Sequence, residues 1–135
     1  MDKFVKDFIF MSIVYLMLAS VLGVVMLGGR LTMLVFVHAH LMLLGWVSMM
    51  IYGVGYHILP RFAGKSLKSK RMAALQFWTA NIGLVGMLGF YAAGLYNPET
   101  RAWKTLSALF GAAEVFSIAL FFYNMLATLY SKTPE

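Results

Sequence analysis

Four long apolar stretches, separated by short polar breaks, make up nearly all of the chain. They cover residues 8–27, 34–59, 73–96 and 105–130. A helix that crosses the roughly 30 Å hydrocarbon core of a bilayer needs about 20 largely apolar residues, and each stretch is long enough. The sequence therefore predicts an all-α fold, an integral membrane four-helix bundle that forms a single transmembrane domain over residues 1–135.

The breaks between the stretches contain turn-forming residues, and their composition excludes some classes of protein. They are Gly28-Gly29-Arg30, residues 60–71, and Asn97-Pro98-Glu99. With 61% hydrophobic and 12% charged residues, the chain needs the lipid bilayer as its solvent. The net charge of +6 does not indicate nucleic-acid binding, because the basic residues lie in the breaks rather than along one helical face. We also expect the first stretch to be retained as a helix rather than cleaved as a signal peptide.

The distribution of basic residues predicts the orientation in the membrane. Alternate breaks of a four-span chain share a side, and the cytoplasmic side carries the excess of Lys and Arg. Three basic residues fall on one side, Arg30, Arg101 and Lys104. Eight fall on the other side: Lys3, Lys6, Arg61, Lys65, Lys68, Lys70, Arg71 and Lys132. We therefore expect both termini and the basic middle loop to be cytoplasmic, in a multi-pass protein of the cell's inner membrane.

All three histidines, His38, His40 and His57, lie in the second apolar stretch. Ionisable residues inside a membrane span are rare, and each is a candidate functional residue. The chain has no cysteine, which excludes disulfides, thiolate metal sites and a covalently attached c-type haem. A metal would have to be held by His, Met, Tyr or carboxylate, although the 11 methionines are more typical of packing.

The spacing of the histidines separates them into different sites. At 100° per residue, His38 and His40 project about 200° apart around a helix, so one helix cannot present both to one iron. They contact two neighbours or serve two sites, or else are buried histidines satisfied by hydrogen bonds. His57 lies about 25 Å along the axis from His40, near the opposite membrane face. We expect His57 to cap the helix end or to meet lipid headgroups there.

Glu114 lies about ten residues into the fourth stretch, near the middle of the membrane. An ionised carboxylate at that depth is destabilised by several kcal/mol unless it is paired or hydrated, so we expect it to be protonated or hydrogen-bonded. Three roles stay open: a hydrogen-bond partner of a histidine ring, a proton-relay group, or an interhelical bond to Asn81 or Ser117.

Three glycines in the third stretch, Gly83, Gly86 and Gly89, follow one another at three-residue spacing. Small residues in such a stripe let another backbone or a flat ligand approach closely. Helix packing is the favoured interpretation, and contact with a cofactor is the alternative.

The second stretch resembles part of a known family. It resembles the tenth helix of subunit I, the catalytic subunit of the haem–copper oxidases. The residues that match are F-V-H-A-H-L-M-L-L-G-W, followed by G-V-G-Y-H-I-L-P-R-F-A-G. This group of enzymes includes cytochrome c oxidases, quinol oxidases and nitric oxide reductases. The specific match covers residues 36–64. The whole chain is similar to short four-helix membrane proteins that themselves resemble subunit I.

The resemblance implies a cofactor and its ligands. In that family the first histidine of the pair binds a high-spin haem and the second a low-spin haem, on opposite sides of the helix. Carried over, His38 and His40 become ligands of a non-covalent haem b, and Gly45 becomes a cofactor-binding glycine, although it falls one residue earlier than in the family pattern. From its depth in the fourth stretch, we expect Glu114 to support this histidine site. An oxidase also needs a three-histidine copper site, and a nitric oxide reductase needs three histidines and a glutamate. With three histidines in all, this chain is not expected to be an oxidase on its own.

The resemblance also implies an assembly. Subunit I has twelve helices in a pseudo-threefold arrangement, and a four-helix chain corresponds to one third of it. Histidines that diverge around one helix find partners most simply on symmetry-related helices, so we expect a homo-oligomer, with a homotrimer favoured. The expected role is electron transfer with a redox partner, or binding of a small gas such as O2, NO or CO. The alternatives are a cofactor-free accessory or structural subunit, and a quinone- or proton-handling component that uses His57 and Arg61.

Overall fold

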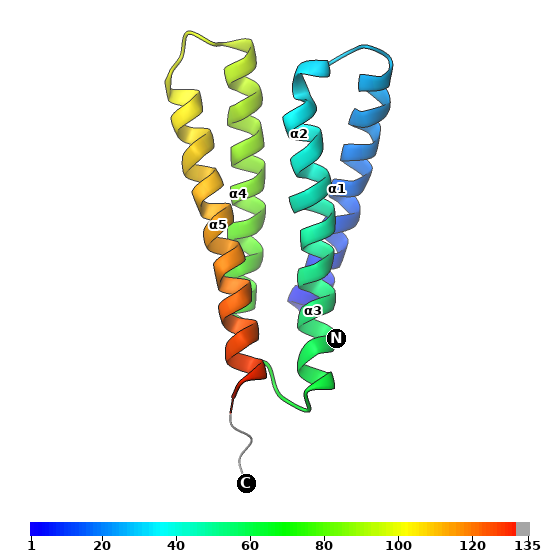
Figure 1. The fold of residues 1–135 in the computed structure, drawn as a ribbon, viewed down its shortest axis with the longest axis vertical. Helices are drawn as coiled ribbons and strands as arrows, with labels where there is room; N and C mark the ends of the chain where they lie inside the picture. The colour runs from blue at the N-terminus through cyan, green and yellow to red at the C-terminus, as the bar shows by residue number, and fades with distance from the viewer. Residues whose placement is uncertain (132–135) are drawn as a thin grey trace.

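The computed structural model describes residues 1–131, which form two antiparallel helical hairpins (Figure 1). The first hairpin pairs α1 (Lys3–Leu27) with a second long helix, which begins with the 3-10 turn η1 (Thr32–Leu34). That helix continues without interruption through α2 (Val35–His40), the π-helical segment η2 (Leu41–Ser48) and α3 (Met49–Phe62). The second hairpin pairs α4 (Lys70–Tyr96) with α5 (Ala102–Leu129). The described residues contain no strand, and the predicted all-α fold is confirmed.

Four helices are long and apolar enough to cross a membrane: Lys3–Leu27, Thr32–Phe62, Lys70–Tyr96 and Ala102–Leu129. All four begin before the predicted apolar stretches, and for two of them the reason is that the charged first-turn residues Lys3 and Lys70 are helical but not apolar. The predicted break at 60–71 is too long. Pro60 lies inside α3, two residues before its end, where proline removes one intrahelical hydrogen bond without stopping the helix. The chain leaves the helix only after Phe62.

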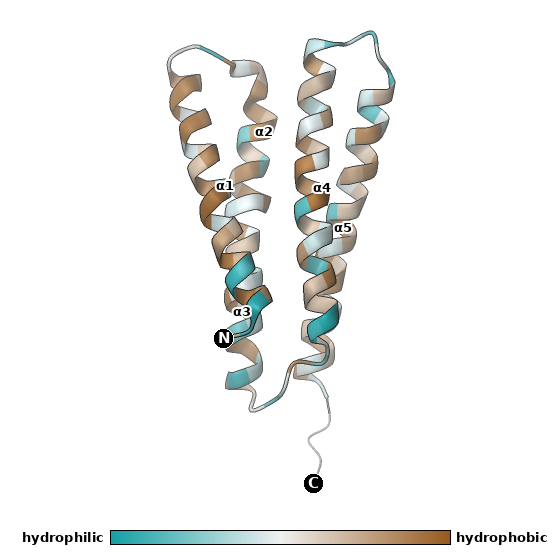
Figure 2. Ribbon diagram, turned by 180° about the vertical axis from the view of Figure 1, so that it is seen from behind, coloured by the Kyte–Doolittle hydropathy of each residue, from teal (hydrophilic) through white to brown (hydrophobic). Residues whose placement is uncertain are grey.

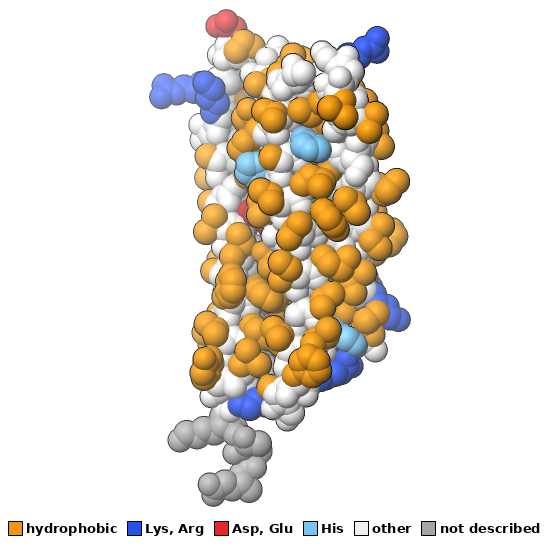
Figure 3. Space-filling model, turned by 45° about the vertical axis from the view of Figure 1, so that its right-hand side comes forward, with side chains coloured by type: hydrophobic (Ala, Val, Ile, Leu, Met, Phe, Trp, Pro, Cys, Tyr) orange, Lys and Arg blue, Asp and Glu red, His pale blue; other side chains and the backbone are white. Residues whose placement is uncertain are grey.

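The outer faces of the helices are apolar, and apart from the buried Glu114 the charged residues lie toward the two ends (Figures 2 and 3). Large side chains such as Phe10, Val24 and Val115 are 65%, 69% and 66% exposed, which suits contact with lipid. The start of α1, the 63–69 loop and the end of α5 share one end of the bundle, which we call the basic end (Figure 1). It carries seven of the eight basic residues assigned to this side, and the eighth, Lys132, lies outside the described residues.

The two hairpins pack together most closely in the half near the basic end. Phe8 of α1 meets Phe77 of α4 edge to face, with ring centroids 5.1 Å apart. Tyr52 and Tyr56 of α3 pack against Phe121 of α5 at 4.7 and 5.1 Å. At the opposite end, which we call the outer end, Phe36 of α2 stacks on Tyr91 of α4 at 4.3 Å. The histidine pair lies near this second contact.

Candidate functional site

His40 is the last residue of α2 and is half-buried. Its Nδ1 lies 2.9 Å from the carbonyl oxygen of Phe36, and its ring centroid is 3.9 Å from that of Phe36. A carbonyl oxygen only accepts hydrogen bonds, so the bond places the proton of the neutral ring on Nδ1. The lone pair of Nε2 is then free to bind a metal.

His38 has the same arrangement on a different side of the helix. Its Nδ1 lies 3.0 Å from the carbonyl oxygen of Ala19 in α1, which again leaves the Nε2 lone pair free. The ring rests on Gly23, where an added Cβ would lie 2.9 Å from the imidazole Cε1. His38 therefore faces α1, whereas His40 lies beside Phe36, which contacts α4. The predicted divergence of the two side chains is found in the structure.

The π-helical segment η2 begins directly after His40. Such segments are wider than an α-helix and occur frequently at functional sites. Gly45, in the middle of η2, is buried against α1, and an added Cβ would lie 2.7 Å from the Cβ of Tyr15. The structure thus places Gly45, an expected cofactor-binding residue, at a close helix contact inside the first hairpin.

Glu114 is buried, with 2% of its surface exposed, and neither carboxyl oxygen has a hydrogen-bond partner among residues 1–131. Neither of the expected hydrogen bonds is formed, and Ser117, which lies on α5 with Glu114, could not have made an interhelical one. Asn81 accepts a bond from the Tyr15 hydroxyl at 2.7 Å, and Ser117 donates to the Gln76 carbonyl at 3.4 Å. The Nδ1 atoms of both histidines are held by backbone carbonyls, so Glu114 does not support either ring by a hydrogen bond within the described chain.

The glycine stripe of α4 packs against α5 at two of its three positions. A Cβ on Gly83 would lie 2.9 Å from the backbone nitrogen of Glu114, and one on Gly86 would strike the ring of Phe110. Gly89 has open space around it. Helix packing therefore accounts for Gly83 and Gly86.

His57 lies in α3 toward the basic end, where its ring contacts the guanidinium group of Arg61. Both residues line a small cavity of about 200 Å³ together with Tyr56, Lys65 and Lys70. This position agrees with the expectation that His57 and the histidine pair occupy opposite ends of the helix.

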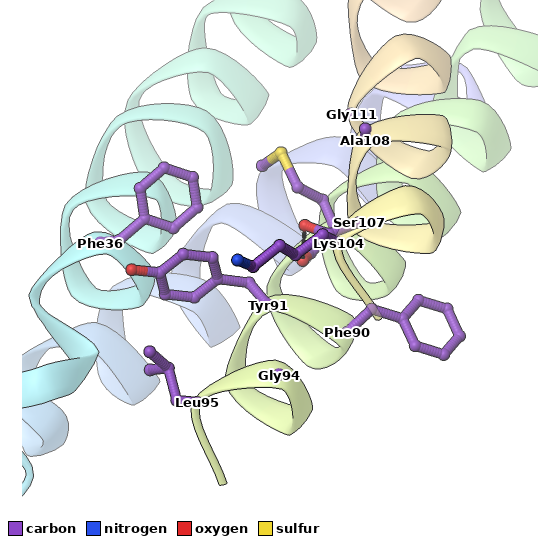
Figure 4. Close-up of a pocket in the computed structure, with 10 residues that line it drawn as sticks. Phe36, Phe90, Tyr91, Gly94, Leu95, Lys104, Ser107, Ala108 and Gly111 are labelled. Atoms are coloured by element: carbon purple, nitrogen blue, oxygen red, sulfur yellow. Dashed lines mark hydrogen bonds between the residues drawn. The ribbon is translucent and has the colours of Figure 1, made fainter. Parts of the chain in front are cut away.

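A second cavity, at the outer end, was not predicted from the sequence. It has a volume of about 360 Å³ and lies between α2, α4 and α5 (Figure 4). Its walls include Phe36, Phe90 and Tyr91, with Lys104 and Ser107 as polar lining residues. Because these residues come from three helices, no local sequence pattern marks the cavity. Phe36 connects it to His40, whose ring lies against the Phe36 ring.

Residues 1–131 contain no group of three or more His, Cys, Asp or Glu side chains that could hold a metal ion. A multi-ligand centre of the kind that binds copper in an oxidase is therefore not built by the described part of one chain. A haem needs only one or two axial ligands, since the porphyrin supplies the other four.

About half of the chain is similar to part of a much larger protein. Over 75 residues it is 37% identical to cytochrome c oxidase subunit 1 of Rhodobacter capsulatus, an alignment that covers 53% of this chain and 13% of that protein. No family model matches the chain, and no solved structure matches it. The four membrane-compatible helices support a multi-pass membrane protein, and about half of it is similar to a small part of an oxidase subunit.

Proposed function

We propose that this chain is a membrane-bound haem b protein that transfers electrons or binds a small gas such as O2, NO or CO. The observation that carries the proposal is the hydrogen bonding of the two histidine rings, which sets their tautomer. Both rings use Nδ1 to bond a backbone carbonyl, at 3.0 Å for His38 and 2.9 Å for His40, and so present an Nε2 lone pair. Haem ligation by histidine requires this tautomer.

The residues present fit a haem bound at the surface of the bundle. Both histidines are half-buried, and histidine side chains are visible on one face of the space-filling view, toward the outer end (Figure 3). Their hydrogen bonds to backbone carbonyls fix the orientation of the rings. Metal-bound histidines are commonly oriented in the same way, by a hydrogen bond from the ring nitrogen that does not bind the metal. Bound haem b would supply a one-electron iron centre or, with an open coordination position, a gas-binding site.

The same geometry supports a shared site in a homo-oligomer. His38 faces α1 and His40 lies on the Phe36 side, so the two rings of one chain diverge. A closed ring of copies brings the His40 face of one chain against the His38 face of the next, and a homotrimer is the form we favour. In this proposal His40 is the principal axial ligand and the neighbour's copy of His38 supplies the second.

We further propose that the protein resides in the inner membrane with its basic end in the cytoplasm. Seven described basic residues at that end, against three at the other, support this orientation. The outer end, with the histidine pair, then faces away from the cytoplasm.

A visible spectrum of the purified protein tests the haem proposal. Wild type should show a Soret band, His40→Ala should lose most of its haem, and His57→Ala should keep it, because about 25 Å of helix separates the two histidines. Spectra of the reduced protein with and without carbon monoxide then distinguish a six-coordinate electron-transfer haem from a gas-binding one. A colourless wild-type protein from haem-supplied cells, or full haem retention in His40→Ala, would contradict the proposal and favour a cofactor-free accessory subunit.

A further inference from the structure

Besides Trp103 at the outer end, three side chains inside the bundle carry buried polar atoms without hydrogen-bond partners among the described residues. They are Tyr56 of α3, Gln76 of α4 and Glu114 of α5, which are 4%, 0% and 2% exposed. The unpartnered atoms are the tyrosine hydroxyl, both amide atoms and both carboxyl oxygens. An unpaired buried polar group costs about 1–3 kcal/mol, and native proteins satisfy such groups with internal water.

These groups follow one another from the basic end toward the middle of the bundle. Tyr56 lines the 200 Å³ cavity at the basic end. Gln76 comes next, and its backbone carbonyl accepts the hydroxyl of Ser117 at 3.4 Å. Glu114 lies three residues before Ser117 on α5, about 4.5 Å further along the axis. Gln76 and Ser117 therefore lie between Glu114 and the basic end of the bundle.

The neighbouring polar residue Asn124 uses one side-chain donor and one acceptor to bond the loop before α4. Its side-chain oxygen accepts the backbone N–H of Ser69 at 3.1 Å, and its amide nitrogen donates to the Ser69 carbonyl at 2.8 Å. Asn124 thus fixes the loop before α4, and neither the Tyr56 hydroxyl nor the Gln76 amide forms a hydrogen bond to it.

We propose that internal water joins Tyr56, Gln76, Ser117 and Glu114, and that Glu114 exchanges its carboxyl proton with the basic end through this water. Glu114 passes its O–H proton to a water molecule and takes another proton back from the chain. One O–H bond breaks as another forms, so no oxidant, reductant or net charge is needed. The proposal concerns the protein alone and holds whether or not the chain binds haem.

The surroundings of Glu114 favour access from the basic end over access from the outer end. Toward the outer end lies the 360 Å³ cavity with mostly apolar walls, and the hydroxyl of its Ser107 already donates to the Met87 carbonyl at 2.9 Å. The other unpartnered buried atom at that end is Trp103 Nε1, which donates but cannot accept, and so cannot relay a proton.

The titratable groups that interact electrostatically with Glu114 are Tyr15 of α1 and Tyr52 of α3. From α4, Gly83 packs against the Glu114 backbone. The single salt bridge among the described residues, between Lys70 and Asp2 at 3.0 Å, lies at the basic end. Because no cation pairs with Glu114, the neutral, protonated carboxyl is the stable form at this depth.

Infrared spectroscopy of the full chain in lipid vesicles tests the proposal. A protonated carboxyl gives a C=O stretching band that shifts in heavy water, and Glu114→Gln identifies the band that belongs to Glu114. We expect the Glu114 band to shift within the mixing time in wild type. Gln76→Leu should slow the shift by about tenfold or more, since an apolar side chain removes two water partners. Thr79→Val, on the same helix, should leave the rate unchanged.

A matched pair of tyrosine variants tests the direction of access. Tyr56→Phe removes a hydroxyl from the basic-end cavity, and Tyr91→Phe removes one from the outer-end cavity. We expect the first to slow the exchange and the second to leave it as in wild type. If Gln76→Leu fails to fold, Ser117→Ala tests the same path, and it should also slow the exchange. Equal rates in all variants, a slowing by Tyr91→Phe alone, or the absence of a protonated Glu114 band would overturn the proposal.

Discussion

At the scale of single residues, the geometry of the histidine pair could be predicted, but its hydrogen bonds could not. The two-residue spacing alone predicts that His38 and His40 diverge, and the structure shows it. The acceptors of their Nδ1 protons are the carbonyl oxygens of Ala19 and Phe36. Any residue can offer a carbonyl, so no sequence pattern identifies these partners. Their effect is nevertheless chemical, since they decide which ring nitrogen is free.

Gly45 provides a prediction at this scale, because it lets α1 and η2 approach closely. A Cβ at Gly45 would lie 2.7 and 2.8 Å from the Cβ and Cγ of Tyr15, atoms near the backbone that cannot move aside freely. We expect Gly45→Ala to destabilise the protein by about 1–3 kcal/mol, the usual cost of overpacking. Thermal unfolding in detergent, followed by circular dichroism, measures the change.

Gly89 supplies the matched control, since it also lies within a membrane-spanning helix but has no atom within 4 Å of an added Cβ. Gly89→Ala should be neutral or stabilise the helix by up to about 1 kcal/mol, the difference in helix propensity. An unfolding temperature for Gly45→Ala equal to that of Gly89→Ala would show that the hairpin does not depend on this contact.

At the scale of helices and loops, hydropathy predicts the number and order of the spans well, because lipid imposes length and apolarity directly on each helix. It predicts their ends less well, since charged first-turn residues continue a helix beyond its apolar part. The π-helical segment η2 could not be predicted. It packs against α1, where Gly45 meets Tyr15, and such a contact between helices leaves no local pattern.

The buried face of α5 is more polar than Glu114 alone indicates. Ser117, Asn124 and Thr128 are buried on the same helix. Their spacings of three, seven and four residues place all four on one helical face. This pattern was available in the sequence, and it would have distinguished a polar interface between helices from an isolated carboxyl. Asn124 and Thr128 bond the backbone of Ser69 and Lys68, which attaches α5 to the loop before α4.

At the scale of the whole molecule, orientation in the membrane gives a direct prediction. The chain has no cysteine, so a thiol reagent can react only with a single cysteine that is introduced. Ser66→Cys lies in the basic-end loop and Thr100→Cys in the opposite loop, and both positions are exposed. Ser69 is less suitable, because its hydroxyl caps α4 by accepting the N–H of Met72 at 3.1 Å.

We expect an impermeant maleimide added to intact cells to label Thr100→Cys but not Ser66→Cys, because the basic end should be cytoplasmic. Both should react after lysis, which controls for accessibility of the thiols. The opposite pattern in intact cells would invert the orientation proposed here, and with it the side on which Glu114 would exchange its proton.

The last prediction concerns the oligomer, and it follows from the divergence of the two histidines. If His40 of one chain and His38 of its neighbour hold one haem, then neither His38→Ala nor His40→Ala chains alone build a complete site. In a closed trimer assembled from both kinds of chain, one of the three interfaces joins an intact His40 to an intact His38. Such mixed trimers, isolated through a different tag on each variant, should therefore bind about one third of the wild-type amount of six-coordinate haem. Mixed trimers made from two tagged forms of His40→Ala are the control and should bind almost none. If the His38→Ala chain alone keeps the wild-type spectrum, a single histidine holds the iron; if mixed trimers bind no more haem than either parent, the site does not lie between subunits.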